Sequence, residues 1–369
     1  MNVRQFFIQW KKNRKRIEVI DRFRKSINES YEKLSIKKEL TSEQEHEIQA
    51  YFKEMIGMDV PTDWHRYFSA RTGEFSVKYI PTAIYRLELI PRMNMFPFKN
   101  AYSDKNLQDI LLPQAKQPEI FLKNMNGYFY IDNNPITIDE AVERCSNLGD
   151  FIIKPSLLSH GRGVAKYHVQ DGSIFETGKG LKDLFAAYKK DFLLQKVVKQ
   201  HKDMAALNPT SINTIRVLTY RSGNEILVVY TVIRIGRKGQ IVDNETAGGM
   251  SAKINKDGTL AKYAYSVPGE DKIEFTDTGI RLLGYKIPSY DKTLAMVKDL
   301  HYHLPFFNLV GWDICIDEQG EPMMIEWNAN SDPSQSANGP AFGEYTDRIL
   351  KETMKCENSR PIESYEFYR

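Results

Sequence analysis

Charged and apolar residues follow one another at helical spacing from residue 1 to about residue 56, and no proline interrupts them. Within this stretch Thr41 offers a helix N-cap with acidic residues after it, and Gly57 is a typical helix stop. Residues 61–118 differ, because aromatic residues there are punctuated by proline. The pattern predicts a helical region over residues 1–60 and an irregular or mixed accessory domain over residues 61–140.

From residue 150 on, short runs rich in β-branched residues are separated by polar or glycine-containing turns. Such runs predict the strands of a large antiparallel sheet. They cover residues 150–155, 192–198, 212–219 and 226–232. Helical patterns lie at 139–145, 291–304 and about 344–354, so the predicted fold class is α+β.

The most informative segment is a predicted β-hairpin formed by residues 309–317 and 322–330. A loop of two residues and a loop of four give the same pairing, in which Asp313 lies directly opposite Glu326. Their Cβ atoms would be roughly 5 Å apart. Strand alternation places Asp313, Glu326 and Asn328 on one face. The other face would carry Val310, Trp312, Ile314, Ile316, Met323, Ile325 and Trp327.

Two facing carboxylates repel each other, and burying them without a partner costs on the order of several kcal/mol. A bound cation would remove this cost, and ligands that are all oxygen atoms favour magnesium. We therefore expect Asp313, Glu326 and Asn328 to bind Mg²⁺. The alternative is that both carboxylates are solvated on the outer face of the sheet and that Asn328 caps the following turn.

Residues suited to phosphate binding precede the hairpin. Lys154 ends an apolar strand, and Gly161 and Gly163 in the next loop would let backbone N–H groups approach phosphate oxygens. Arg216 is the only charge in the run 212–220, so it needs an anionic partner, either a ligand or a carboxylate on a neighbouring strand. The glycine loop matches neither GxxxxGK[ST] nor GxGxxG, so a P-loop and a Rossmann site are not supported.

Composition narrows the class of protein. The 369-residue chain is 41% hydrophobic and 27% charged, as in globular proteins, and lacks the run of about 18 to 20 apolar residues that a membrane span needs. No signal-peptide pattern begins the sequence. The three distant cysteines, Cys145, Cys315 and Cys356, fit a reducing compartment. We therefore expect a cytoplasmic protein.

Charge is concentrated at the N-terminus. Residues 1–25 contain nine basic and two acidic residues, a local charge of +7, which leaves −4 for the rest of a chain whose total is +3. This distribution argues against a nucleic-acid groove across the folded body. The basic, amphipathic segment either packs its apolar residues on the body or contacts an anionic membrane or a partner protein.

Taken in chain order, these motifs resemble the ATP-grasp superfamily: Lys154, the Gly161/Gly163 loop, Gln195, Asn213-Thr214-Ile215-Arg216, and Asp313 followed by Glu326-Trp327-Asn328. Residues 208–216, Asp243-Asn244 with Gly248-Gly249, and Ser103-Asp104-Lys105-Asn106 are similar to its sugar-transfer-associated branch. The resemblance covers roughly residues 100–350. It implies an ATP-grasp fold of two α+β lobes clasping ATP. Residues 141–205 would form the small lobe, 206–350 the large lobe with the metal site, and 351–369 a tail.

The resemblance also implies roles for individual residues. Lys154 and Arg216 would contact the ATP phosphates beneath the Gly161/Gly163 loop. Asp313, Glu326 and Asn328 would hold Mg²⁺ between the phosphates. The adenine pocket would be lined by Gln195, Lys196 and Val198, and the ribose would be bound by His201 or Asp203. The catalytic residues would be Arg216, Arg234 and Asn244, of which Arg234 and Asn244 would face the acceptor together with Asn213.

Three functional hypotheses follow. The first is an ADP-forming, ATP- and Mg²⁺-dependent ligase that joins a carboxylate to an amine or hydroxyl through an acyl phosphate, in polysaccharide or cell-envelope biosynthesis. The second is a kinase acting on a sugar or polyol hydroxyl, for which Asp243 would be the base. The third, a nucleotide-binding module without turnover, fits least well, because the metal set and the phosphate-binding cations are all present. In each case the partner is a small or sugar-linked molecule and not a nucleic acid.

Overall fold

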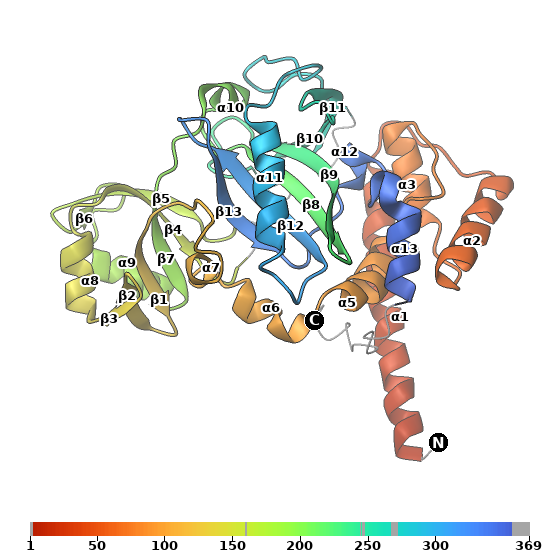
Figure 1. Cartoon of the computed structure of the whole chain (residues 1–369), viewed down its shortest axis with the longest axis horizontal. Coiled ribbons are helices and arrows are strands. Elements are labelled where there is room, and N and C mark those ends of the chain that lie inside the picture. The colour runs from red at the N-terminus through yellow and green to blue at the C-terminus, as the bar shows by residue number, and fades with distance from the viewer. Residues whose placement is uncertain (1–2, 159–160, 244, 246–247, 267–271, 356–369) are drawn as a thin grey trace.

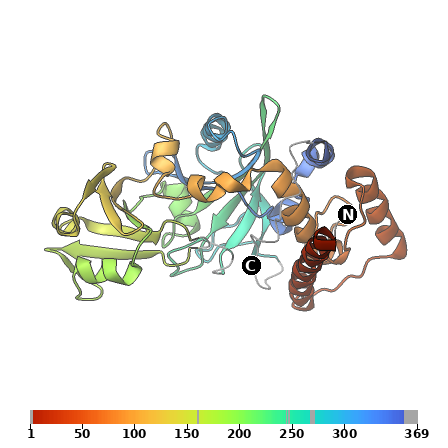
Figure 2. The same ribbon diagram turned by 90° about the horizontal axis from the view of Figure 1, so that it is seen from below.

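The computed structural model describes residues 3–158, 161–243, 245, 248–266 and 272–355, with side chains from residue 14 on. Figures 1 and 2 show three parts along the molecule: N-terminal helices at one end, one β-sheet in the middle and a second β-sheet at the other end. No helix within these ranges is both long and apolar enough to cross a membrane.

The first residues form helices, as the pattern predicts. Helix α1 covers Val3–Glu32, α2 covers Ser42–Ile56 and α3 covers Asp63–Thr72. Thr41 and Gln44 make a capping box at the start of α2, and Gly57, with φ of 73°, ends it. The second half of α1 packs on α3, where Ile20, Phe23 and Ile27 lie against a small aromatic core. The apolar residues in this half of the basic segment therefore pack on the body, which is one of the two alternatives expected for the segment.

Residues 82–111 are more helical than the proline-rich pattern suggests. They form α4 Thr82–Ile84, a π-helical turn Tyr85–Leu89, α5 Ile90–Met93, α6 Phe96–Tyr102 and α7 Gln108–Leu111. Pro97 lies in the first turn of α6, where a missing N–H group costs no helical hydrogen bond. Pro91 directly follows the π-helical turn, inside the continuous helical stretch 82–93. Proline therefore does not interrupt the helices of this region.

The seven-stranded sheet is antiparallel throughout, in the order β3-β2-β1-β7-β4-β5-β6. Its strands are β1 Ile120–Met125, β2 Tyr128–Ile131, β3 Asn134–Ile136, β4 Gly149–Pro155, β5 Ala165–Gln170, β6 Ser173–Ile174 and β7 Phe192–Lys196. Helices α8 Ile138–Cys145 and α9 Leu181–Tyr188 share its apolar core. The boundary expected after residue 140 falls inside this unit, which begins at residue 120.

The six-stranded sheet is also antiparallel, in the order β11-β10-β9-β8-β12-β13. Its strands are β8 Thr214–Ser222, β9 Glu225–Ile235, β10 Met250–Ile254, β11 Leu260–Ser266, β12 Leu309–Ile316 and β13 Pro322–Asn328. The remaining helices are α10 Lys202–Leu207, α11 Tyr290–His301, α12 Gln335–Asn338 and α13 Thr346–Met354, with a 3-10 turn at Gly343–Tyr345. One face packs against α11 around Trp312 and Trp327.

The opposite face of this sheet is divided along its strands. Leu218 and Tyr220 on β8 lie in an apolar core with residues of α2 and α13, among them Phe52 and Leu350. Arg216 lies on the same face of the same strand, one alternation earlier. The face is therefore packed by terminal helices at one end and polar at the other.

The predicted hairpin is confirmed at its functional end. Gly311 pairs with Asn328, Trp312 with Trp327, and Asp313 with Glu326. The prediction is wrong closer to the loop, where a β-bulge shifts the pairing so that Ile314 lies opposite Met324. The loop has three residues, because the Asp317 N–H group donates to the Glu321 carbonyl and Gly320 has φ of 80°.

The bulge changes which side chains are buried. Met324 is fully buried in the core behind the sheet, and Ile325 lies on the side of Glu326, opposite to the face predicted for it. Met323 is only partly buried, so it does not join the core as expected. The cause is the extra residue that a bulge inserts in one strand, which reverses the alternation between the loop and Glu326.

Candidate functional site

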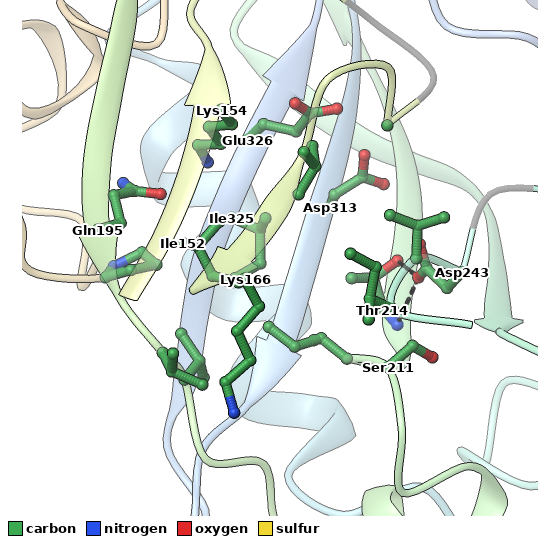
Figure 3. A pocket seen from close by; sticks show the side chains of 18 of the residues that line it. Ile152, Lys154, Lys166, Gln195, Ser211, Thr214, Asp243, Asp313, Ile325 and Glu326 are labelled. Carbon is green, nitrogen blue, oxygen red and sulfur yellow. Dashed lines mark hydrogen bonds between the residues drawn. The ribbon is translucent and has the colours of Figure 1, made fainter. Parts of the chain in front are cut away.

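A cleft of about 460 Å³ lies between the two sheets. Its walls come from β4, β5 and β7 on one side and from β8, β9, β12 and β13 on the other. Figure 3 shows Lys154 and Gln195 at one end, Asp313 and Glu326 in the middle, and Thr214 with Asp243 at the other end. Segments that are far apart in the sequence therefore meet in one cavity.

The first end of the cleft combines an apolar slot with one polar strand residue. Ile152 on β4 pairs with Gln195 on β7, and both line the cleft together with Val197, Val198 and Ile325. Gln195 is buried, with 7% of its surface exposed. A slot of this kind suits a flat apolar ring with polar edges. Gln195 and Val198 are as predicted, whereas Ile152, Val197 and Ile325 were not predicted here, and the bulge brings Ile325 to the slot.

Lys154 follows Ile152 on the same strand and points into the cleft (Figure 3). Its side chain is buried, and burial, aided by the nearby charge of Lys105, lowers its pKa to about 8. Glu326 opposes this shift. A lysine held partly desolvated in a cleft binds an anion more strongly than an exposed one, because water competes less.

The glycine loop is shaped by close contacts. Gly161 and Gly163 have φ of 68° and 72°, and a Cβ atom on Gly163 would come within 2.8 Å of Pro155 Cγ. The Tyr188 hydroxyl donates to the Gly163 carbonyl at 2.8 Å. Gly161 lines the cleft, whereas Gly163 packs the loop against β4. The two glycines therefore serve different purposes, one at the cleft and one behind it.

Lys105 is a site residue to which the sequence analysis gave no role. Its Nζ lies 3.3 Å from Glu326 Oε2 and donates to the Leu158 carbonyl at 2.9 Å. It lines the cleft beside Lys154. The motif Ser103-Asp104-Lys105-Asn106 is similar to the family's, but no local pattern indicates a contact with Glu326, which is far away in the sequence.

Asp313 lies in a row of charges that crosses three adjacent strands. It pairs in register with Arg216 on β8 and with Glu326 on β13. Arg216 holds both of its oxygens, with Nε to Oδ1 at 2.6 Å and Nη2 to Oδ2 at 2.8 Å. Arg234 Nη1 lies farther away, at 3.3 and 3.4 Å. Burial alone would raise the pKa of Asp313, but Arg216 and Arg234 outweigh it and lower that pKa.

Arg216 is therefore not placed as predicted. It lies beside Asp313 on the neighbouring strand, outside the residues that line the cleft, and its Nη1 donates to Ser331 Oγ at 2.8 Å. Gly311 makes this arrangement possible, because a side chain there would collide with Ser331. Of the two alternatives for Arg216, a carboxylate on a neighbouring strand is its partner. Arg234 does line the cleft.

The expected metal ligands lie together. Asn328 Nδ2 is 3.5 Å from Asp313 Oδ2 and 3.4 Å from Glu326 Oε1. Turning the amide by half a rotation would direct its oxygen to the same point. The described residues hold no cluster of three or more His, Cys, Asp or Glu side chains that could bind a metal. Two carboxylates and one amide still fit the oxygen-only preference of Mg²⁺, although the oxygens of Asp313 are shared with two arginines.

Thr214 and Asp243 form the other end of the cleft (Figure 3). Asp243 Oδ2 accepts hydrogen bonds from the Thr214 N–H group, at 3.0 Å, and from the Thr214 hydroxyl. Burial raises the pKa of Asp243 despite the opposing effects of Arg234 and Thr214. Asn244, expected beside it, lies outside the described residues.

Four other expected residues do not line the cleft with their side chains. Lys196 is exposed and pairs with Glu119 at 3.2 Å. His201 Nδ1 accepts from the Asp203 N–H group and caps α10. Asp203, the other residue expected at the ribose, is also absent from the lining. Asn213 is fully buried and donates to the carbonyls of Met204 and Asn208, so it holds the preceding loop together.

Comparison with known proteins places this geometry in context. Solved structures with similar folds include D-alanyl-alanine synthetase A from Vibrio cholerae, with 13% identity and a TM-score of 0.40 over 69% of this chain and 65% of that one. An L-amino acid ligase from Bacillus licheniformis matches with 13% identity and a TM-score of 0.36, over 71% and 50%. A D-alanine–D-alanine ligase from Bacillus anthracis matches with 11% identity and a TM-score of 0.39, over 68% and 67%.

The match thus spans less than two thirds of the first two structures' own lengths. A search of curated proteins gave no match. A family model described as sugar-transfer associated ATP-grasp matches residues 85–349, well over half of the sequence, and this chain therefore belongs to the sugar-transfer associated ATP-grasp family.

Proposed function

We propose that this protein is an ATP- and Mg²⁺-dependent ligase that joins a carboxylate to an amine or hydroxyl acceptor and forms ADP and phosphate. The observation that carries the proposal is the order of groups along the cleft: the apolar slot, then Lys154 and Lys105, then Glu326 and Asp313, then Arg234. This order suits an adenine ring, a polyphosphate with its metal, and a second anionic substrate, in that sequence. The family match supports the same reading.

At the nucleotide end, we assign adenine to the slot beside Gln195 and Val198, with the Lys196 backbone and not its side chain at the ring edge. Lys154 and Lys105 would contact phosphate oxygens, since both residues line the cleft. The Gly161 backbone would cover the phosphates. Positive charge held in a dry cleft stabilises the charge that develops during phosphoryl transfer.

The metal would be held by Asp313, Glu326 and Asn328. A bound magnesium ion would supply positive charge to the phosphate oxygens and help to align them for in-line transfer. Arg216 orients Asp313 through two hydrogen bonds, so its role in the proposal is positioning rather than phosphate contact. Glu326, tied to Lys105 on one side and near Asn328 on the other, links the metal set to the phosphate-binding lysines.

Arg234 is assigned to the carboxylate substrate. Its contacts to Asp313 are longer than those of Arg216, so much of its hydrogen-bonding capacity remains for a ligand. A carboxylate bound there would lie between the phosphate-binding lysines and the Thr214/Asp243 end. Attack on the terminal phosphate would give an acyl phosphate, and an acceptor at the far end would then displace phosphate.

The setting of the reaction is part of the proposal. The cytoplasm supplies ATP and magnesium, and the described cysteines, Cys145 and Cys315, are buried and unpaired, as expected in a reducing compartment. The family description names sugar transfer, and on that basis we assign the reaction to biosynthesis of a polysaccharide or another part of the cell envelope. The acceptor would then be a small or sugar-linked molecule.

The test follows the oxygen atoms. The protein is incubated with ATP, magnesium, hydroxylamine and a panel of ¹⁸O-carboxylates that includes amino acids and uronic acids, with carboxylate omitted as the control. A ligase moves one ¹⁸O into inorganic phosphate and forms a hydroxamate. Carboxylate-independent phosphate transfer that leaves the phosphate on a sugar or polyol would replace the proposal with a kinase. ATP binding without consumption across the panel would replace it with a binding module.

A further inference from the structure

Asp243 is a carboxylate with 8% of its surface exposed, at the end of the cleft away from Lys154 and Gln195 (Figure 3). One of its oxygens, Oδ2, accepts both hydrogen bonds from Thr214. Within the described part of the chain, Oδ1 has no hydrogen-bond partner, and it is not sealed from the cleft. A buried carboxylate with one oxygen fixed and one available is costly unless a ligand uses it.

The surroundings of Asp243 restrict what that ligand can be. Thr214 on β8 pairs in register with Arg234 on β9, so the fixed carboxylate lies beside the arginine assigned to the carboxylate substrate. Asp313 on β12 is the other charge that acts on it. The nearby lining is apolar or carries hydroxyl groups, from Ser211, Ile212, Ile241 and Val242. An anionic group next to Asp243 would be repelled, whereas an amine or alcohol would donate to it.

We propose that Asp243 is a catalytic residue that accepts the proton of the attacking amine or hydroxyl, with Thr214 as its positioning residue. This inference rests on the proposed ligase function and assigns the acceptor to the Asp243 end of the cleft. It also excludes a carboxylate or phosphate as the attacking group.

The step balances without a further reagent. The acceptor nitrogen or oxygen forms a bond to the carbonyl carbon of the acyl phosphate, and its proton moves to Asp243 Oδ1. The bond from that carbon to the phosphate oxygen breaks, and inorganic phosphate leaves with the electron pair. Asp243 then releases the proton to solvent. A base whose pKa lies above the usual carboxylate range is better matched to this task near neutral pH, and burial shifts Asp243 in that direction.

The variant Asp243→Asn tests the inference with little change in shape. The asparagine oxygen can still accept from the Thr214 N–H group and hydroxyl, so the loop stays attached to β8. Thermal unfolding of the variant checks that it does. Asp347→Asn is the matched control, because Asp347 lies on α13, outside the cleft, where it pairs with Lys78.

Two half-reactions are measured on the full chain with the carboxylate found in the ¹⁸O experiment. The first is carboxylate-dependent positional isotope exchange in [βγ-¹⁸O]ATP without acceptor, which reports acyl phosphate formation. The second is hydroxamate formation with hydroxylamine. In Asp243→Asn, isotope exchange should stay within about threefold of wild type, while hydroxamate formation should fall by about 100-fold or more, the usual contribution of a general base. Asp347→Asn should match wild type in both.

The pH profile separates a catalytic from a structural role. Wild-type hydroxamate formation should decline as pH falls through the pKa of Asp243, and this limb should vanish in Asp243→Asn. The inference is overturned if the variant retains both half-reactions, or if it loses both in equal measure. If wild-type protein shows no carboxylate-dependent exchange at all, the proposed ligase function is refuted, and this inference, which rests on it, is refuted as well.

Discussion

Removing the guanidinium that holds Asp313 should cost stability in a way that depends on pH. In Arg216→Met the two short hydrogen bonds to Asp313, at 2.6 and 2.8 Å, are lost, and Arg234 remains only at 3.3 and 3.4 Å. Breaking a buried ion pair by removing one partner costs roughly 3–5 kcal/mol. Because Arg234 stays, we expect a loss near the lower limit, about 3 kcal/mol at pH 7.

The sign of the pH dependence follows from Asp313. Its pKa in the folded protein is below the ordinary value, so the pair adds stability above the unfolded-state pKa of about 3.9, and that stability is lost as pH falls through the folded-state pKa. In Arg216→Met the pKa of Asp313 should rise. The difference in the free energy of unfolding between wild type and variant should therefore be largest near pH 7 and shrink toward pH 4.

Urea unfolding followed by tryptophan fluorescence measures this difference, since Trp312 and Trp327 are buried behind the charged row. Magnesium is omitted so that only protein groups titrate. The double variant Arg216→Met/Asp313→Leu serves as the control and should recover part of the loss, because no buried charge is left unpaired. Equal unfolding midpoints at pH 7, or a difference that does not change with pH, would refute the reasoning.

Three further results are expected. Glu326→Gln should abolish ADP formation while leaving metal-free ATP binding, measured by calorimetry, within a few fold of wild type; unchanged turnover would contradict the metal role. ATP affinity should weaken as pH rises above about 8, where the Lys154 charge is lost, and Lys154→Met should bind weakly with no such pH dependence; a wild-type affinity that is flat between pH 7 and 9 would contradict this. Gly163→Ala should lower ATP affinity by about tenfold, because φ of 72° and the contact of the new Cβ with Pro155 at 2.8 Å force the loop to shift. Calorimetry tests this, with Gly178→Ala as the control, since a Cβ there has no atom within 4 Å.

The sequence was most informative where alternation and pairing act together. Asp313 opposite Glu326 was predicted from loops of two or four residues, whereas the loop has three, which alone would place Asp313 opposite Ile325. The β-bulge restores the predicted pairing at Asp313. The bulge at Ile325 could not be predicted, because Met324 and Ile325 are both apolar and either could face the core. Family membership and the ATP-grasp fold, expected from the motifs, are confirmed by the match over residues 85–349.

Contacts between segments that are far apart in the sequence could not be predicted either. Lys105 reaches Glu326 across more than two hundred positions, and no local pattern indicates that contact. Arg216 was correctly identified as a charge that needs an anion, but only the register of β8 with β12 shows that the anion is Asp313. Asn213 looked like a polar site residue, yet its carbonyl partners show that it closes a loop.

One face of the six-stranded sheet carries both an apolar core and the charged site, so the terminal helices that cover the apolar part also support the site. Strand β8 carries Arg216 at one end and Leu218 and Tyr220 beneath α2 and α13 at the other. A fragment cut to residues 85–349 would lose α2 and the second half of α13, with Phe52 and Leu350, although it would contain each charged residue of the cleft. We therefore expect this fragment to be less stable than the full chain and, because β8 also carries Arg216, to hold Asp313 less firmly.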